Sequence, residues 1–304
     1  MKKRIPAFVL ALVLLFVCTV SVFAVETPYA DSQFLSVGAY SVHYRVIPHE
    51  GEYQGRILFL HGFLCSTYAW RNMAAEMSAR GYDCVLADLP NFGYTTRETP
   101  ELAHTDREDL MKTLMDTLAP GEEWILAGHS MGGGVAVNIA EEYPVRAVLL
   151  YCPAVQSTAP ENMSGLVGSR PMRFLMNTFF KVGTRLSFVV RLVVAAATWD
   201  WNFGMQYDVH GVTDPFLYDG IGSGMCTMIT SVRETNLADA GKVTAPVLLV
   251  EADKDIILDG NSKTAFSAAF PNAVTYTVAG GGHQCIENRA SELAAVTADF
   301  LAQK

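Results

Sequence analysis

Short apolar runs alternate with helical patterns along most of this chain, and this alternation restricts its possible folds more than any other feature. Strands separated by helices of about ten to fifteen residues predict a mostly parallel sheet with helices on both faces. The pattern therefore predicts an α/β fold. The expected strands are 34–37, 42–47, 56–60, 83–88, 124–127, 146–151, 246–251 and 274–278, and the expected helices are 68–80, 102–118, 132–143, 262–270 and 290–301.

One long interruption breaks the alternation. It runs from Pro153 to about Leu237, directly after the expected strand 146–151. Because the alternation resumes afterwards, the interruption is typical of an insertion on the rim of the sheet. We therefore expect one core in two parts, residues 25–152 and 238–304, with residues 153–237 inserted between them.

The composition indicates a globular chain and argues against a nucleic-acid partner. Half of the 304 residues are hydrophobic and 17% are charged, which excludes disordered and low-complexity classes. A net charge of −9 disfavours binding to a phosphate backbone. The six cysteines form no C-x-x-C pair and the chain has no H-E-x-x-H, so we expect scattered buried thiols and no metal site.

The first residues are typical of an export signal. Lys2-Lys3-Arg4 precede an uncharged, mostly apolar stretch from Ile5 to Val25, and Val22-Phe23-Ala24 would permit cleavage after Ala24. The same stretch is long enough to span a bilayer if it is retained. We therefore expect residues 1–24 to be a signal peptide or an N-terminal membrane anchor. The remaining chain would work outside the cytoplasm, either secreted or attached to the outer face of the cytoplasmic membrane.

The pentapeptide Gly128-His129-Ser130-Met131-Gly132 is a G-x-S-x-G sequence between an expected strand and an expected helix. A sharp strand-to-helix turn strains the serine backbone, and glycines at the flanking positions avoid clashes. Such a turn leaves the Ser130 hydroxyl at the tip of the sheet, next to a helix N-terminus where an oxyanion is stabilised. Ser130 is therefore the candidate nucleophile.

A serine hydroxyl needs a base to take its proton, and in chains with this turn the acid and then the histidine follow the serine. Two histidines follow Ser130. His210 lies in the insertion with no strand before it, whereas His283 follows the strand 274–278 and the flexible segment Ala279-Gly280-Gly281-Gly282. We therefore expect His283 to be the base.

The end of the strand 246–251 carries three acids that could orient the imidazole: Glu251, Asp253 and Asp255. Asp255 lies in the loop just beyond the strand and is the expected third member of a catalytic triad. Asp253 is the alternative. Where they are not catalytic, Asp253 and Glu251 are expected to cap the loop or face solvent.

A developing oxyanion needs preorganised hydrogen-bond donors. One expected donor is the backbone N–H of Met131, directly after the nucleophile. The other is the backbone N–H of Phe63 in Leu60-His61-Gly62-Phe63, a loop that follows an earlier strand. Gly62 would let the backbone turn inward at this point.

From about Val37 onwards the chain resembles the α/β-hydrolase family. The resemblance is carried by Leu60-His61-Gly62-Phe63, Asp88-Leu89-Pro90-Asn91-Phe92-Gly93, Gly128-His129-Ser130-Met131-Gly132-Gly133, Asp255 and Gly282-His283. It implies an eight-stranded, mostly parallel sheet with helices on both faces and an inserted helical cap at 153–237, and no cofactor. Two departures are Asn91 and Ala252, where the family commonly has glycine.

The expected cap has an uneven charge distribution. Between Glu161 and Asp200 it has no acidic residue, and its five basic residues fall within an arc of about 120° on a helix. They are Arg170, Arg173, Lys181, Arg185 and Arg191. One interpretation is a pair of helices with apolar faces over a pocket and basic faces in water. The other is a basic stripe with an apolar back that lies on an anionic membrane.

Either interpretation favours a hydrophobic acyl substrate, and the resemblance implies a serine hydrolase that cleaves small-molecule carboxylic esters. The candidate pocket residues are Trp199, Trp201, Phe203 and Phe216. An aminopeptidase or amidase is an alternative that needs an acidic anchor, for which the candidates are Asp200, Asp208, Asp214 and Asp219. A carbon–carbon bond hydrolase is a further alternative, and a slow-turnover ligand-binding or sensing module is the alternative of another class.

Membrane association is expected, if at all, through residues 5–25 or the basic cap segment. The sequence carries no signal for an oligomeric state.

Overall fold

The computed structural model describes residues 28–102, 106–258 and 260–303. The chain divides into two compact units, Met1–Ala30 and Asp31–Lys304, and the description below concerns the second. The predicted signal peptide or anchor, residues 1–24, lies outside the described residues. Within the described ranges, no helix combines the length and apolar character needed to cross a bilayer.

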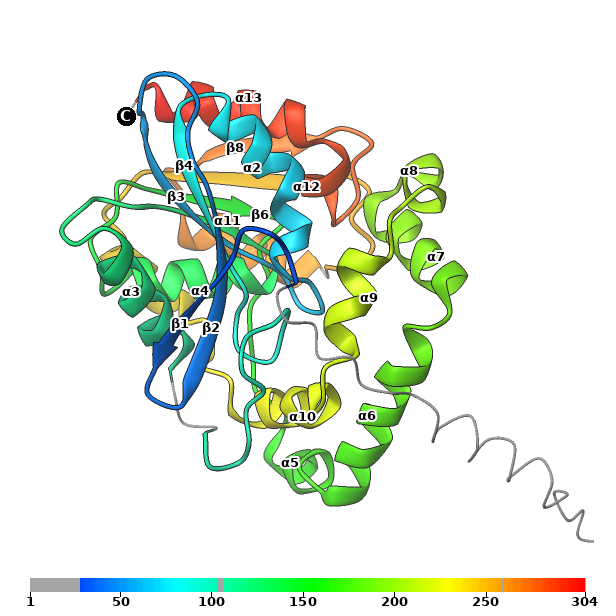
Figure 1. Cartoon of the computed structure of the whole chain (residues 1–304). Coiled ribbons are helices and arrows are strands. Elements are labelled where there is room, and N and C mark those ends of the chain that lie inside the picture. The colour runs from blue at the N-terminus through cyan, green and yellow to red at the C-terminus, as the bar shows by residue number, and fades with distance from the viewer. Residues whose placement is uncertain (1–27, 103–105, 259, 304) are drawn as a thin grey trace, which may run out of the picture. The chain divides into compact units, whose positions relative to one another are not determined.

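Eight strands form one sheet in the order β1-β2-β4-β3-β5-β6-β7-β8 (Figure 1). β1 pairs antiparallel with β2, β2 pairs antiparallel with β4, and every later pairing is parallel. The predicted eight-stranded, mostly parallel sheet is therefore confirmed. The strands are β1 (Ser32–Val37), β2 (Tyr40–Ile47), β3 (Gly55–Leu60), β4 (Tyr82–Ala87), β5 (Ile125–His129), β6 (Ala147–Tyr151), β7 (Val247–Ala252) and β8 (Val274–Val278).

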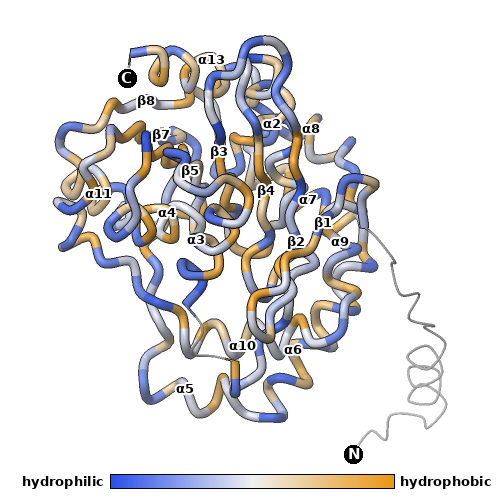
Figure 2. The backbone as a smooth tube through the Cα atoms, turned by 60° about the vertical axis from the view of Figure 1, so that its left-hand side comes forward, coloured by the Kyte–Doolittle hydropathy of each residue, from blue (hydrophilic) through white to orange (hydrophobic). Residues whose placement is uncertain are grey.

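Helices cover both faces of the sheet because successive side chains of a strand point to opposite sides. In β3, Leu58 packs in one hydrophobic core and Phe59 in the other. The first core lies under α3 (Arg107–Leu118), α4 (Met131–Ala140) and α11 (Gly260–Ala269), and the second under α2 (Arg71–Ser78) and α13 (Ala290–Leu301). Figure 2 shows hydrophobic segments, in orange, running through this sheet.

Helix boundaries differ from the predicted ones where a capping residue intervenes. The helix expected over 102–118 begins at Arg107, because the Asp106 side chain accepts a hydrogen bond from the backbone N–H of Glu108. The start of the predicted range overlaps residues 103–105, which lie outside the described residues. The helix expected over 68–80 is a 3₁₀ turn, η1 (Thr67–Trp70), followed by α2. These differences leave the sheet unchanged.

The inserted segment, residues 153–237, is described throughout and contains helices but no strand. Its helices gather on one side of the sheet in Figure 1, and its ends join the neighbouring parallel strands β6 and β7. The helices are α5 (Glu161–Val167), α6 (Arg170–Gly183), α7 (Ser187–Thr198), α8 (Trp201–Met205), α9 (His210–Phe216) and α10 (Ile221–Ser231). A short 3₁₀ turn, η2 (Leu237–Lys242), leads back to the core.

Candidate active site

Ser130 occupies a strained turn between β5 and α4. Its backbone has φ +51° and ψ −119°, a region that residues with a side chain rarely adopt. The backbone is held there because Ser130 N–H donates to the Tyr151 carbonyl at 3.0 Å and the Ser130 carbonyl accepts from the N–H groups of Gly133 and Ala154. A Cβ on Gly132 would lie 2.2 Å from the Leu60 carbonyl oxygen, so only glycine fits at that position.

His283 and Asp255 are hydrogen-bonded to each other. His283 Nδ1 donates to Asp255 Oδ2 at 2.8 Å, with 5% of the His283 side chain and 0% of the Asp255 side chain exposed. The other carboxylate oxygen of Asp255 accepts from the N–H groups of Ile257 and Leu258 at 2.9 and 3.0 Å. Burial alone would raise the pKa of Asp255, but His283 and these two amides outweigh it and lower that pKa. Asp255 therefore stays ionised and fixes the proton of His283 on Nδ1.

The Ser130 turn and the His283 loop meet through His129. His129 Nε2 donates to the His283 carbonyl oxygen at 2.9 Å, and the two imidazole rings lie 4.9 Å apart. Burial, followed by the nearby charge of His283, lowers the pKa of His129 to about 3, so its ring stays neutral. Both Ser130 and His283 are described, and no hydrogen bond joins Ser130 Oγ to the His283 ring. Such bonds often form only when substrate is bound.

The loop after β3, which contains Gly62 and Phe63, approaches Ser130. The Gly62 carbonyl accepts from His61 Nδ1 at 2.8 Å and from the Cys65 N–H at 3.2 Å. Because the two polar groups of a trans peptide point in opposite directions, the Phe63 N–H points away from these donors. A Cβ on Gly62 would lie 3.1 Å from Ser130 Cβ, which shows how closely this loop approaches the serine.

His61 holds this loop in place. Its Nε2 accepts from the Leu89 N–H at 3.0 Å, which leaves the proton on Nδ1 for the Gly62 carbonyl. Burial lowers the pKa of His61 and keeps the ring neutral. The second expected donor, the N–H of Met131, belongs to the first residue of α4, where helix N–H groups lack intrahelical partners. Both expected donors therefore lie near Ser130.

The competing candidates lie elsewhere. His210 is exposed and pairs with Asp214 at 3.2 Å on its own helix. Asp253 is exposed, accepts from the Gly280 N–H at 2.7 Å and pairs with Lys254 at 3.5 Å. The structure thus brings His283 together with Asp255 rather than with Asp253.

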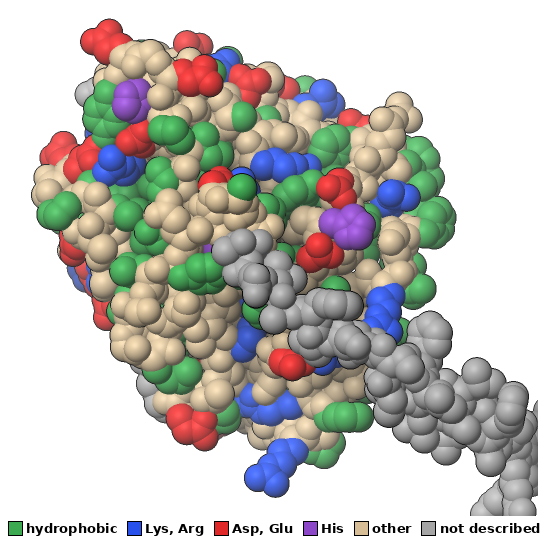
Figure 3. All heavy atoms as spheres, in the orientation of Figure 1, with side chains coloured by type: hydrophobic (Ala, Val, Ile, Leu, Met, Phe, Trp, Pro, Cys, Tyr) green, Lys and Arg blue, Asp and Glu red, His purple; other side chains and the backbone are tan. Residues whose placement is uncertain are grey.

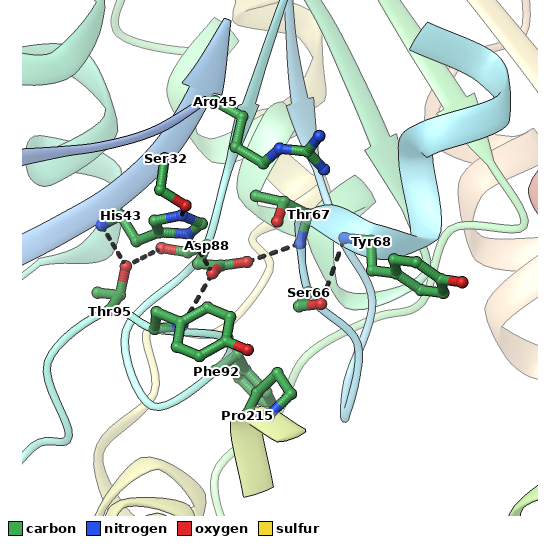
Figure 4. Close-up of polar contacts among 12 residues, drawn as sticks. Ser32, His43, Arg45, Ser66, Thr67, Tyr68, Asp88, Phe92, Thr95 and Pro215 are labelled. Atoms are coloured by element: carbon green, nitrogen blue, oxygen red, sulfur yellow. Dashed lines mark hydrogen bonds and ion pairs between the residues drawn. The ribbon is translucent and has the colours of Figure 1, made fainter. Parts of the chain in front are cut away.

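A second chain of hydrogen bonds links Ser32, His43 and Asp88, as Figure 4 shows. His43 Nε2 lies 2.8 Å from Ser32 Oγ, and His43 Nδ1 lies 2.6 Å from Asp88 Oδ2. Asp88 also accepts from the backbone N–H groups of Thr67 at 2.6 Å and Tyr94 at 2.8 Å. Burial would raise the pKa of Asp88, but the hydrogen bonds from His43 and Thr67 outweigh it and lower that pKa. Asp88 therefore ties together β2, β4 and the segment that precedes α2.

The sequence arguments missed His61 and His129, which position the loops of the site. The only sequence signals for them are their places within Leu60-His61-Gly62-Phe63 and within the G-x-S-x-G sequence. Neither pattern shows which carbonyl an imidazole will contact. Those partners, Gly62 and the distant His283, become evident only in the folded chain.

Among the described residues, one group of side chains could hold a metal ion: Cys152, Asp255 and His283, whose ligand atoms lie within 4.8 Å of one another. The hydrogen bond with Cys285, together with burial, raises the pKa of the Cys152 thiol. Since a thiol must lose its proton to bind a cation, and Asp255 is already bonded to His283, this group fits a metal poorly.

The inserted segment borders the His283 loop. The N–H groups of Gly282 and Gln284, on either side of His283, donate to the carbonyls of Thr198 and Ala197 at the end of α7. Tyr207, between α8 and α9, donates to Glu287 at 2.7 Å, and Glu287 also pairs with Arg71 at 2.5 Å. Hydrogen bonds from the insertion therefore reach the backbone around the candidate base.

A small apolar cavity lies between the insertion and the loops that follow β3 and β4. Six of its lining side chains are Leu64, Phe92, Val212, Pro215, Phe216 and Ile221. Of the four aromatic residues expected in a pocket, Phe216 lines this cavity. Trp199 and Trp201 are 51% and 64% exposed, and Phe203 packs against Tyr207. The two tryptophans do not line this cavity, and Phe203 lines a separate surface pocket beside Tyr68 and Arg71.

Comparison with known proteins identifies the family and the fold. The family described as "alpha/beta hydrolase fold" matches residues 55–289. An uncharacterised hydrolase of Bacillus subtilis, YugF, is 23% identical over 273 residues, covering 88% of this chain and 96% of YugF. A pyrethroid hydrolase of Sphingobium wenxiniae is 26% identical over 257 residues, covering 80% of this chain and 86% of that protein.

Solved structures show the same fold at low sequence identity. The epoxide hydrolase CorEH has a TM-score of 0.69 and 20% identity, covering 90% of this chain and 98% of CorEH. The matched region, residues 55–289, includes Ser130, Asp255 and His283 and makes up well over half of the chain. The chain therefore belongs to the alpha/beta hydrolase family.

Proposed function

We propose that this protein is a serine hydrolase that cleaves carboxylic esters through an acyl-enzyme on Ser130. One observation carries the proposal: the strained Ser130 turn lies beside a His283 that is oriented by a buried Asp255. The relatives named as hydrolases, among them the pyrethroid hydrolase, support hydrolysis as the type of reaction. The roles of the individual residues rest on the geometry.

In this mechanism His283 Nε2 takes the proton of Ser130 Oγ as the oxygen attacks the ester carbonyl. Asp255 keeps the other ring proton on Nδ1 and stabilises the imidazolium that forms. The N–H groups of Met131 and Phe63 bind the oxyanion. His283 then returns the proton to the leaving alcohol, and a water activated by His283 hydrolyses the acyl-enzyme. Every proton moves between groups of this chain, the substrate and water.

The acyl group is proposed to be hydrophobic. The cavity beside Leu64, the residue that follows the proposed oxyanion donor, is lined mainly by apolar side chains from the core and from α9 and α10. The cavity has a volume of only about 10 Å³, room for one water, so it does not enclose an acyl chain, but its apolar lining favours an apolar group over a charged one beside the site. The inserted segment is proposed to act as a cap, because its backbone contacts the His283 loop. We also propose that the protein is exported to the outer side of the cytoplasmic membrane.

The aminopeptidase alternative needs a carboxylate that is available to bind a substrate amine. The four candidate anchors already have local partners. Asp200 caps α8, Asp208 accepts from the His210 N–H, Asp214 pairs with His210 and Asp219 pairs with Lys181. No observation favours a carbon–carbon bond hydrolase or a slow-turnover binding module over ester hydrolysis.

Hydrolysis of p-nitrophenyl esters from acetate to palmitate tests the proposal. We expect turnover by the full-length protein, a loss of turnover in Ser130→Ala, and a preference for acyl chains longer than acetate. Undiminished hydrolysis by Ser130→Ala would rule out the acyl-enzyme. Activity on amides but not on any ester would favour the amidase alternative.

A further inference from the structure

The outward side of α6 is apolar. Phe174, Leu175, Phe179 and Val182 are 74%, 58%, 64% and 51% exposed, and their spacing places them on one face of the helix. The segment that follows also has exposed apolar side chains, namely Leu186, Phe188, Val189 and Val193, which are 54%, 59%, 46% and 61% exposed. We call these eight residues the apolar face. Single exposed apolar side chains are common, whereas a contiguous set marks a contact surface.

The inward side of α6 carries the buried Phe180, which stacks on Phe216, together with several polar contacts. Asn177 Oδ1 accepts from the N–H groups of Gly222 and Ser223 at the start of α10, at 2.8 and 3.1 Å. Arg173 donates to the side chain of Thr227 at 2.6 Å, and Lys181 pairs with Asp219 at 2.6 Å. The expectation of apolar sides over a pocket and basic sides in water is met only in part. Phe180 packs on the cavity residue Phe216 and Arg185 is exposed, but four other apolar side chains of α6 face outward. The packing of Phe180 and the bonds of Asn177 and Arg173 attach α6 to the protein and leave the apolar side outward.

The charged side chains of the segment from Arg170 to Arg191 are all basic, although Lys181 is paired with Asp219. Arg170 and Arg185 are both exposed and lie at the two ends of α6. No acidic residue occurs between residues 162 and 199, although the whole chain has a net charge of −9. In Figure 3, hydrophobic side chains gather near α7 and α8 at the right-hand edge of the molecule. An apolar helix face with cationic ends matches the interface of an anionic bilayer, where apolar side chains enter the acyl region and arginines reach the headgroups.

We propose that the apolar face docks on the surface of an anionic lipid bilayer, with α6 lying in the interface. A second copy of this chain is a poorer occupant. In a two-fold contact between antiparallel α6 helices, Arg170 of one copy would meet Arg185 of the other, and the two like charges would repel. The lipid proposal does not depend on the proposed catalytic role of Ser130.

Binding of the full-length protein to vesicles provides the first test. Vesicles of phosphatidylcholine with or without phosphatidylglycerol would be sedimented with the wild type and with Phe174→Ser/Phe179→Ser. The matched control is Phe34→Ser/Val274→Ser, which removes two exposed apolar side chains from β1 and β8. We expect the α6 variant to bind anionic vesicles about tenfold more weakly and the control to bind like the wild type. We expect Arg170→Gln/Arg185→Gln to lose affinity only where phosphatidylglycerol is present.

A second measurement guards against binding through residues 5–25, which lie outside the described residues. An environment-sensitive dye would be attached at Thr178→Cys, within the exposed side of α6, and at Thr275→Cys on β8, with the labelled wild type as the blank. We expect brominated lipid to quench the Thr178 dye and to leave the Thr275 dye unchanged. Equal quenching at both sites, or none at Thr178, would overturn the proposal. So would a dimer in lipid-free solution that Phe174→Ser/Phe179→Ser dissociates, because a second copy would then occupy the face.

Discussion

The protein has two sets of a serine, a histidine and an aspartate, and the two sets differ in their surroundings. One set is Ser130, His283 and Asp255, and the other is Ser32, His43 and Asp88. Ser32 is already within hydrogen-bond distance of its histidine, at 2.8 Å, whereas Ser130 is not hydrogen-bonded to His283. Ser130 has a strained backbone at the start of α4 and two candidate amide donors nearby. Ser32 lies on the edge strand β1, where the backbone is ordinary strand.

The comparison teaches that a Ser–His–Asp hydrogen-bond order does not by itself define a catalytic site. An oxyanion must form next to the serine, and it needs amide donors that point at it. In the Ser32 set, the His43 and Asp88 side chains are fully buried, and Asp88 also accepts two backbone N–H groups. That arrangement holds strands and loops together. The Ser130 set is held by other contacts, and its serine is left for substrate.

The largest expected effect separates the two serines. Ser130→Ala should lower kcat/KM for p-nitrophenyl butyrate by about 10⁴-fold or more, because the nucleophile is lost. Ser32→Ala should change kcat/KM by less than about twofold and lower the free energy of unfolding by about 1 kcal/mol, since one hydrogen bond is removed. The measurements are initial rates and urea denaturation. A large loss of activity in Ser32→Ala with a stable fold would reverse the comparison.

The two aspartates should differ in the property that they control. Asp255→Asn should lower kcat by about 10³- to 10⁴-fold with little loss of stability, because His283 would lose its oriented tautomer. Asp88→Asn should lower the free energy of unfolding by about 2–3 kcal/mol, because a buried acceptor of several hydrogen bonds is weakened. Rates and denaturation curves of both variants are the measurements. Equal stability losses with equal activity losses would contradict this division.

His61 should act on catalysis through the position of the Phe63 amide. His61→Leu should lower kcat by about 10- to 100-fold with a smaller change in KM, because the oxyanion is bound less well in the transition state. His61→Asn keeps a donor near the Gly62 carbonyl and should recover part of that loss. Steady-state kinetics of the two variants measure this. A change in KM alone would show that His61 affects substrate binding instead.

The pH dependence of stability should give the smallest effect. The pKa of Asp88 is lowered in the folded state, so its ionised form stabilises the fold. This contribution is fully present above the ordinary aspartate pKa of about 4 and is lost as the pH falls through the lower pKa of the folded state. The difference in free energy of unfolding between the wild type and Asp88→Asn should therefore shrink on acidification. A difference that grows below pH 4 would contradict the direction of the pKa shift.

The sequence was sufficient for features that depend on local periodicity and chain order. The eight strands follow from short apolar runs, and the pairing of Asp255 with His283 follows from their places after β7 and β8, which lie side by side. Asn91 departs from the glycine of the family but takes φ +74°, a backbone region that asparagine tolerates better than most residues. Local sequence therefore specified both the sheet and the candidate acid and base.

The orientation of α6 was not predictable from periodicity. A helical pattern shows that polar and apolar residues lie on opposite faces, but it does not show which face meets the rest of the protein. That choice is made by distant partners, because Asn177 bonds to the start of α10 and Lys181 pairs with Asp219. The positioning roles of His61 and His129 also depend on contacts that periodicity does not show. His61 bonds to the Gly62 carbonyl and the Leu89 N–H, and His129 bonds to the carbonyl of the distant His283.

Labelling with a fluorophosphonate, followed by peptide mass spectrometry, tests the central claim most directly. The reagent reacts with a serine that has both an activating base and an oxyanion site. We predict a single adduct on the peptide that contains Ser130, with none on the peptide that contains Ser32, and a loss of labelling in His283→Ala. An adduct on Ser32, or labelling of Ser130 that is unaffected by His283→Ala, would contradict the assignment of the active site.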